Sequence, residues 1–164
     1  MTARPDVRFL LAHPAHFIAL GFGSGLSPFA PGTFGTLVAI PFAFALRAYT
    51  NDVVFMVAIV LLFAVGAWAA QVTGRDLGVA DHGSIVIDEV AAFLLVLFFV
   101  GGGVLQQAVA FLLFRVFDIV KPPPIRQVDV AYKNGIGVMA DDVLAALYAL
   151  LVFAIGQRIF GGTA

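Results

Sequence analysis

The stretch VVFMVAIVLLFAVGAWAAQVT, residues Val53–Thr73, contains no charged residue. Its length matches the roughly 20 apolar residues that an α-helix needs to cross a bilayer. A backbone surrounded by hydrocarbon must satisfy its hydrogen bonds within the segment, which favours a helix over an open strand. The stretch therefore predicts a transmembrane helix and an integral membrane protein.

The composition of the whole chain supports this prediction. Hydrophobic residues make up 62% of the 164 residues and charged residues 12%, whereas soluble domains have roughly 45–50% and 25%. The mean hydropathy is +1.04. A soluble domain of this size has too little interior to bury so much apolar surface. We expect residues 1–164 to form a single membrane-embedded domain.

Charge and cysteine content exclude several function classes. The formal net charge of -1 gives no field that would attract nucleic acid. The chain has no cysteine, which excludes disulfides, thiolate nucleophiles and zinc–thiolate sites. His13, Pro14 and His16 interrupt the apolar run near the N-terminus, so we expect no cleaved signal peptide there.

Four further apolar segments are predicted to be helical for the same reason. They are Phe34–Tyr49, Ile85–Val100, Val104–Val120 and Val138–Ile159. Because some are short, Ile85–Val120 is compatible with two tilted spans or with a re-entrant hairpin. Ile125–Tyr132 is expected to form a short interfacial helix. The predicted fold class is all-α: a small polytopic membrane helical bundle of about five apolar helices plus an N-terminal interfacial or re-entrant helix over Phe9–Phe22.

The junctions between the apolar segments are of two kinds. Thr50–Asp52 and Gly101–Gly103 are tight turns, whereas Gly21–Thr33, Gly74–Ser84 and Lys121–Gly137 are longer and richer in charge, glycine and proline. Antiparallel threading places the three long junctions on one membrane face and both tight turns on the other. The two faces are therefore expected to differ in chemistry.

Basic residues orient the bundle. Seven of the nine fall on the face of the long junctions, and only Arg47 and Arg158 lie opposite. The seven are Arg4, Arg8, Arg75, Arg115, Lys121, Arg126 and Lys133. By the positive-inside bias, this face is predicted to be cytoplasmic.

Acidic residues gather on the same face, at the ends of three apolar segments. They are Asp88, Glu89, Asp118, Asp141 and Asp142. Neighbouring helical positions diverge by about 100°, so each adjacent pair is expected to direct one carboxylate inward and the other elsewhere. Converging carboxylates repel one another unless protons or a cation relieve the repulsion. Mg²⁺ suits an all-oxygen ligand set. All five are therefore candidate catalytic and metal-binding residues; alternatively, they are boundary residues or partners of nearby basic side chains.

Arg115, Asp118 and Lys121 follow one another at three-residue spacing, which places them on one stripe of a helix. Pro122–Pro124 ends that helix and holds Lys121 at the membrane rim. We predict that Arg115, Lys121 and Arg126 bind an anionic phosphate-bearing headgroup. An ion pair within the helix is the alternative for Arg115, Asp118 and Lys121.

The junction Gly21–Thr33 is rich in glycine and hydroxyl side chains and leads into a helix. Such a backbone can present N–H groups to phosphate, so Ser24, Ser27 and Thr33 are candidate phosphate ligands. His82, in the sequence Asp81-His-Gly-Ser, is a further candidate as a ligand or proton carrier.

Four blocks of sequence together resemble the phosphatidylglycerophosphatase A family. They are GFGSGLS with PGT (Gly21–Thr33), DHGSIVIDE (Asp81–Glu89), RVFDIVKPPPIR (Arg115–Arg126) and GIGVMADD (Gly135–Asp142). The blocks stand in the family's order and spacing and extend over most of the chain. Pro123 is a departure, because a bulky aromatic residue is common there.

The resemblance implies a small helical enzyme of the bacterial inner membrane, active in phospholipid biosynthesis. It would hydrolyse phosphatidylglycerophosphate to phosphatidylglycerol and phosphate and would depend on Mg²⁺. The residues by themselves predict only an anionic, phosphate-bearing substrate near the cytoplasmic interface, together with a metal.

A different class of function, a small cation- or proton-coupled transporter, would also use buried carboxylates. Transport favours ionisable groups near the bilayer midplane, whereas the centres of all five apolar segments are uncharged. The distribution of charge therefore favours an interfacial enzyme.

Overall fold

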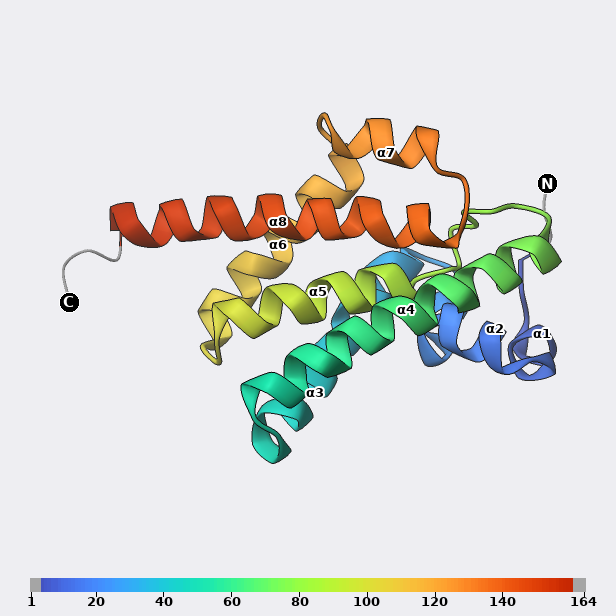
Figure 1. The fold of residues 1–164 in the computed structure, drawn as a ribbon, viewed down its shortest axis with the longest axis horizontal. Coiled ribbons are helices and arrows are strands. Elements are labelled where there is room, and N and C mark those ends of the chain that lie inside the picture. The colour runs from blue at the N-terminus through green and yellow to red at the C-terminus, as the bar shows by residue number, and fades with distance from the viewer. Residues whose placement is uncertain (1–3, 161–164) are drawn as a thin grey trace.

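The computed structural model describes residues 4–160, and Figure 1 shows these residues as a bundle of helices without strands. The helices are α1 (Val7–Ala12), α2 (Pro14–Ala19), the 3₁₀ helix η1 (Gly21–Leu26), α3 (Pro31–Tyr49), α4 (Asp52–Leu77), α5 (Ile87–Val100), α6 (Val104–Val120), α7 (Ile125–Ala131) and α8 (Gly135–Phe160). All five apolar segments are helical. The all-α prediction is confirmed for the described residues.

Within residues 4–160, three helices are long and apolar enough to cross a membrane: α3, α4 and α8. α5 and α6, with 14 and 17 residues, fall short of the roughly 20 residues of a full span. Ten of the fourteen residues of α5 are buried, and it packs against α3, α4, α6 and α8. α5 is therefore the central core helix of the bundle, and its first turn is held in place from several sides.

The threading of the chain agrees with the sequence prediction. In Figure 1 the end of α4 and the starts of α5 and α8 lie toward the right of the view, the side on which α1 and α2 also lie. The turns that join α3 to α4 and α5 to α6 lie on the left. The acidic starts of α5 and α8 are therefore at the same end of the bundle.

The N-terminal segment forms three short helices where one was predicted. Pro14 has no N–H to continue α1, and the ring of His13 instead accepts a hydrogen bond from the Ala15 N–H (3.1 Å) to start α2. Phe22, with φ of 59°, interrupts the chain again inside η1. The buried His16 then joins these helices to α4, because its Nε2 lies 2.8 Å from Asp76 Oδ2.

Close contact between α4 and α8 sets the position of the start of α8. The Gly135 N–H donates to Gln71 Oε1 at 2.8 Å. A Cβ on Gly135 would overlap the carbonyl oxygen of Ala67, so only glycine permits this approach. The start of α8 therefore lies directly on α4, with Asp141 and Asp142 about two turns further along.

Candidate active site

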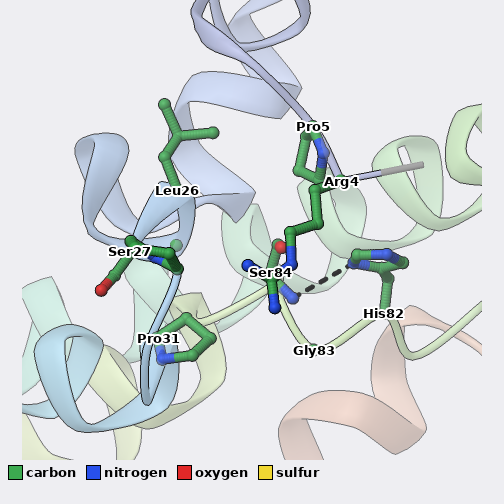
Figure 2. A pocket seen from close by; sticks show the side chains of 10 residues that line it. Arg4, Pro5, Leu26, Ser27, Pro31, His82, Gly83 and Ser84 are labelled. Carbon is green, nitrogen blue, oxygen red and sulfur yellow. Dashed lines mark hydrogen bonds between the residues drawn. The ribbon is translucent and has the colours of Figure 1, made fainter. Parts of the chain in front are cut away.

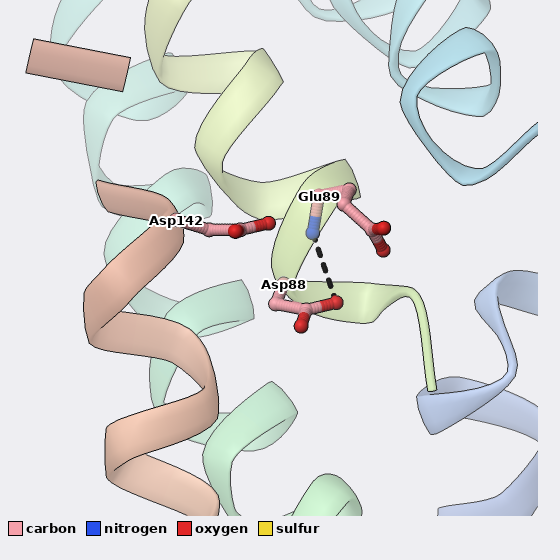
Figure 3. A group of neighbouring side chains, drawn as sticks. All are labelled: Asp88, Glu89 and Asp142. Atoms are coloured by element: carbon pink, nitrogen blue, oxygen red, sulfur yellow. Dashed lines mark hydrogen bonds between the residues drawn. The ribbon is translucent and has the colours of Figure 1, made fainter. Parts of the chain in front are cut away.

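Three carboxylates from two helices form a cluster at this end of the bundle (Figure 3). Asp88 and Glu89 lie in the first turn of α5, and Asp142 reaches toward them from α8. One carboxylate oxygen from each lies within 4.8 Å of the others. We call Asp88, Glu89 and Asp142 the carboxylate cluster.

The carboxylate cluster is buried and incompletely hydrogen-bonded. Asp88 is 7% exposed and Asp142 is 2% exposed. Within the part of the chain that the structure describes, Glu89 Oε2 and Asp142 Oδ2 have no hydrogen-bond partner. Buried carboxylates this close together repel one another, and unpaired oxygens are costly to bury. The all-oxygen cluster has the chemistry of a site for a hard divalent cation.

The two adjacent acidic pairs behave differently. Asp141 turns away to Lys121 while Asp142 enters the cluster, as the helical geometry predicts. The same prediction is wrong for Asp88 and Glu89, since both contribute to the cluster. At the start of α5 the Asp88 side chain folds back, and its Oδ1 accepts the backbone N–H of Glu89 at 3.0 Å. The backbone N–H groups of a first helical turn have no partner within the helix, so a side chain in that turn can fold back and accept one of them.

Arg115 connects α6 with the carboxylate cluster. Its Nη1 lies 2.6 Å from Asp118 Oδ2 and 3.5 Å from Glu89 Oε1. The same nitrogen donates to the Thr36 hydroxyl at 3.3 Å. Arg115 Nε is buried and has no hydrogen-bond partner among residues 4–160. Asp118 therefore lies beside the cluster and shares Arg115 with it. The ion pair within α6, which was the alternative to phosphate binding, exists between Arg115 and Asp118 and also extends to Glu89 on α5.

Lys121 ends α6 in a left-handed conformation, with φ of 45°. Its ammonium donates to Asp141 Oδ2 on α8 and lies 3.4 Å from Asp129 Oδ1 on α7. Burial alone would lower the pKa of Lys121, but the hydrogen bond and charge of Asp141, together with Asp129, raise it above its ordinary value. Burial acts to raise the pKa of Asp129, and the charge of Lys121 outweighs it and holds that pKa low. The cation thus joins three helices around the site.

Replacing Lys121 by methionine is expected to destabilise the protein by about 2–4 kcal/mol, because Asp141 would stay buried without a counter-charge. Lys133→Met is the matched control. Lys133 is half exposed and contacts only the Asp129 end of this network, so its loss should cost less than about 1 kcal/mol. Unfolding in detergent micelles measures both. Equal losses would contradict a specific role for the Lys121–Asp141 pair.

The remaining predicted phosphate ligands lie around the glycine-rich junction and on α7. The Ser24 hydroxyl donates to the Gly21 carbonyl (2.8 Å), and Thr33 lies in the first turn of α3. Ser27 and His82 line a cavity of about 320 Å³ between η1 and the segment before α5 (Figure 2). Arg126 is exposed on α7 and lines a separate hollow. The structure thus brings Ser27 and His82 together and leaves Arg126 apart from them.

Two residues at the site carry no signal in the sequence that marks them as functional. The Thr36 hydroxyl contacts Arg115 and also donates to the Gly32 carbonyl at 2.9 Å. A Cβ on Gly32 would overlap the Glu89 carboxylate and come within 3.2 Å of Arg115 Nη1. Only the packing of α3 against α5, together with the contact of Thr36 with Arg115 on α6, shows that the first turns of α3 form a wall of the site.

The three long apolar helices define a membrane protein, and the buried carboxylate cluster beside an arginine at one end of the bundle has the chemistry to hold a cation next to an anionic group. The family model for phosphatidylglycerophosphatase A matches residues 17–157. The chain therefore belongs to the phosphatidylglycerophosphatase A family. This membership identifies it as a lipid phosphomonoester hydrolase of phospholipid biosynthesis, which confirms the enzyme prediction over the transporter alternative.

Three relatives extend over nearly the whole chain. The phosphatidylglycerophosphatase A of Haemophilus influenzae is 44% identical over 153 residues, covering 92% of this chain and 94% of its own. That of Escherichia coli K12 is 38% identical, covering 92% and 88%. A Bacteroides thetaiotaomicron protein, provisionally named a phosphatidylinositol-3-phosphatase, is 39% identical over 151 residues and covers 88% and 94%. No solved structure matches the chain.

Proposed function

We propose that the carboxylate cluster is the centre at which the terminal phosphomonoester of phosphatidylglycerophosphate is hydrolysed to phosphatidylglycerol and phosphate. The observation that carries this proposal is the convergence of Asp88, Glu89 and Asp142 within 4.8 Å, beside the cation of Arg115. Hydrolysis of a phosphomonoester needs both anionic ligands for a metal and a positive group for phosphate oxygens. This end of the bundle contains both.

Mg²⁺ is the proposed metal, and Asp88, Glu89 and Asp142 would hold it. Their fit rests on the oxygen-only donor set and on the unpartnered Glu89 Oε2 and Asp142 Oδ2 in the described chain. Asp118 and Asp141 stand next to this set, bound to Arg115 and Lys121. A bound Mg²⁺ would polarise the phosphate and lower the pKa of a coordinated water.

The protein's own side chains account for the remaining chemistry. In the reaction a water oxygen forms a bond to phosphorus, the bond from phosphorus to the glycerol oxygen breaks, and that oxygen leaves with a proton. A carboxylate of the site accepts the proton of the water and passes it to the glycerol oxygen as that bond breaks. The Nε–H of Arg115, which has no hydrogen-bond partner in the described part of the chain, can donate to a phosphate oxygen while its Nη1 stays on Asp118. Lys121 contributes positive charge from the rim of the site. This charge favours the negative charge that develops on the phosphate oxygens during the reaction.

The names of the relatives suggest which feature of the substrate matters. Phosphatidylglycerophosphate and phosphatidylinositol 3-phosphate both carry a phosphomonoester on a polyol that is joined to the lipid through a phosphodiester. We propose that this chain acts on the first of these lipids. Ser27 and His82, which line the cavity beside the cluster, would contact its headgroup, and Ser24 and Thr33 would shape the adjacent backbone.

The active end of the bundle is proposed to face the cytoplasm of a bacterial inner membrane. Seven of the nine basic residues belong to this end by the threading of the helices, and positive charge is retained on the cytoplasmic side. The acyl chains of the substrate would stay in lipid against the exposed apolar surfaces of α3 and α6.

Chelation is the direct test of metal dependence. Phosphate release from phosphatidylglycerophosphate in detergent micelles is expected to fall at least about 100-fold in EDTA and to return when Mg²⁺ is restored in excess. Adding Ca²⁺ instead of Mg²⁺ after EDTA is the control. Ca²⁺ should restore less phosphate release, because it prefers larger and more flexible coordination. Full turnover in EDTA would contradict a metal centre at the carboxylate cluster.

A further inference from the structure

A cavity of about 320 Å³ lies beside the carboxylate cluster, between the N-terminal segment, η1 and the segment before α5. Its volume falls at the lower end of the roughly 300–1,000 Å³ typical of small-molecule sites. Figure 2 shows the side chains of Arg4 and His82 both directed toward Ser84 at its centre. The cavity belongs to the end of the bundle where the substrate headgroup would arrive.

The polar groups of this cavity suit an anion. Arg4 is exposed and takes part in none of the ion pairs found within residues 4–160. His82 Nδ1 accepts the N–H of Ser84 at 3.2 Å, so the neutral ring carries its proton on Nε2 as a donor. Ser84 is 8% exposed and lines the cavity, where its hydroxyl adds a second neutral polar group. No lining residue in the described chain is acidic.

The cavity and the carboxylate cluster share structural elements. Pro31 lines the cavity, and the next residue, Gly32, lies against the Glu89 carboxylate. Ser84 lines the cavity from the other side and precedes Asp88 by four residues. Consecutive Cα atoms are about 3.8 Å apart, so the walls of the two sites adjoin one another at Pro31 and Gly32.

We propose that this cavity binds the phosphodiester of the lipid substrate, with Arg4 as the charged ligand and Ser84 and His82 as neutral donors. The proposal rests on the proposed function, in which the terminal phosphomonoester occupies the carboxylate cluster. A phosphodiester carries one negative charge and only acceptor oxygens, which match a cavity whose polar side chains are donors. The cavity thereby distinguishes lipids with two phosphates from lipids with one.

Arg4→Ala is expected to raise KM for phosphatidylglycerophosphate about tenfold, the effect of losing one charge-assisted hydrogen bond. kcat should stay within about twofold, because the phosphodiester does not change during the reaction. Turnover of phosphatidic acid, which has a phosphomonoester and no phosphodiester, should be unaffected. Arg4→Lys keeps the charge and should restore much of the affinity, while Arg8→Ala, a matched change outside the cavity, should match the wild type.

Product inhibition gives an independent measurement. Phosphatidylglycerol retains the phosphodiester, so its inhibition should weaken about tenfold in Arg4→Ala, while inhibition by inorganic phosphate is unchanged. An unchanged KM for phosphatidylglycerophosphate, or equal losses on phosphatidic acid, would overturn the proposal. If the wild type fails to hydrolyse phosphatidylglycerophosphate, the proposed function is wrong. Binding of phosphatidylglycerol to the wild type and to Arg4→Ala, measured by calorimetry, would then still decide the role of the cavity.

Discussion

Asp142→Asn is expected to reduce phosphate release from phosphatidylglycerophosphate by more than about 100-fold. Losing a group that only orients a metal ligand costs up to roughly 100-fold, and Asp142 would hold the metal itself. Asp142 is 2% exposed, belongs to the carboxylate cluster and has an oxygen without a partner in the described chain. Asparagine keeps the shape and removes the charge that would bind a cation. Turnover at saturating Mg²⁺ measures the effect.

Two further measurements separate loss of the site from loss of the fold. Removing one of three mutually repelling carboxylates should leave the thermal stability of the EDTA-treated protein equal to or above that of the wild type. Asp52→Asn makes the same chemical change at an exposed position at the opposite end of the bundle and should leave turnover unchanged. Wild-type turnover by Asp142→Asn would remove the carboxylate cluster from the mechanism.

Gly32→Ala is expected to lower kcat by about 100-fold, the order of loss that follows a displacement of about 1 Å in a catalytic group. The added methyl group would overlap the carboxylate of Glu89 and come 3.2 Å from Arg115 Nη1. Glu89 or α3 must then move. Steady-state kinetics on the purified protein measures the loss.

Gly156→Ala is the matched control for this substitution. Gly156 also lies within a helix, and a Cβ there meets nothing within 4 Å. Alanine in a helix is otherwise more stable than glycine by about 0.5–1 kcal/mol, so the control variant should be fully active and no less stable. A Gly32→Ala variant with wild-type kcat would show that the start of α3 does not form a wall of the catalytic site.

The helices were predictable because their cause is local. An apolar segment in lipid must satisfy its own backbone hydrogen bonds, so Val53–Thr73 predicts α4 without knowledge of its neighbours. The exception was Phe9–Phe22, where one predicted helix is three short ones. Pro14 is visible in the sequence, but the positive φ of Phe22 depends on the packing of η1 and is not.

The site was predictable only in part. The acidic ends of α5, α6 and α8 were identifiable because charge near lipid is costly and a bundle threads its ends to defined faces. Which of these acidic residues join the cluster and which pair with a basic side chain was not predictable. Asp142 joins the cluster while Asp141 binds Lys121, and Asp118 shares Arg115 with Glu89. These choices depend on how far each helix is rotated about its axis.

The sequence by itself determined that the chain lies in lipid, where its five apolar helices run, which end of the bundle carries the charges and, through four blocks in register, the family. Each follows from composition or from spacing along one chain. The tertiary structure alone decided that Gly32 and Thr36 border Glu89 and Arg115, and that Arg4 and Ser84 share a cavity. Such contacts join segments far apart in the chain, and they depend on the rotation and close approach of packed helices, which residue spacing does not encode.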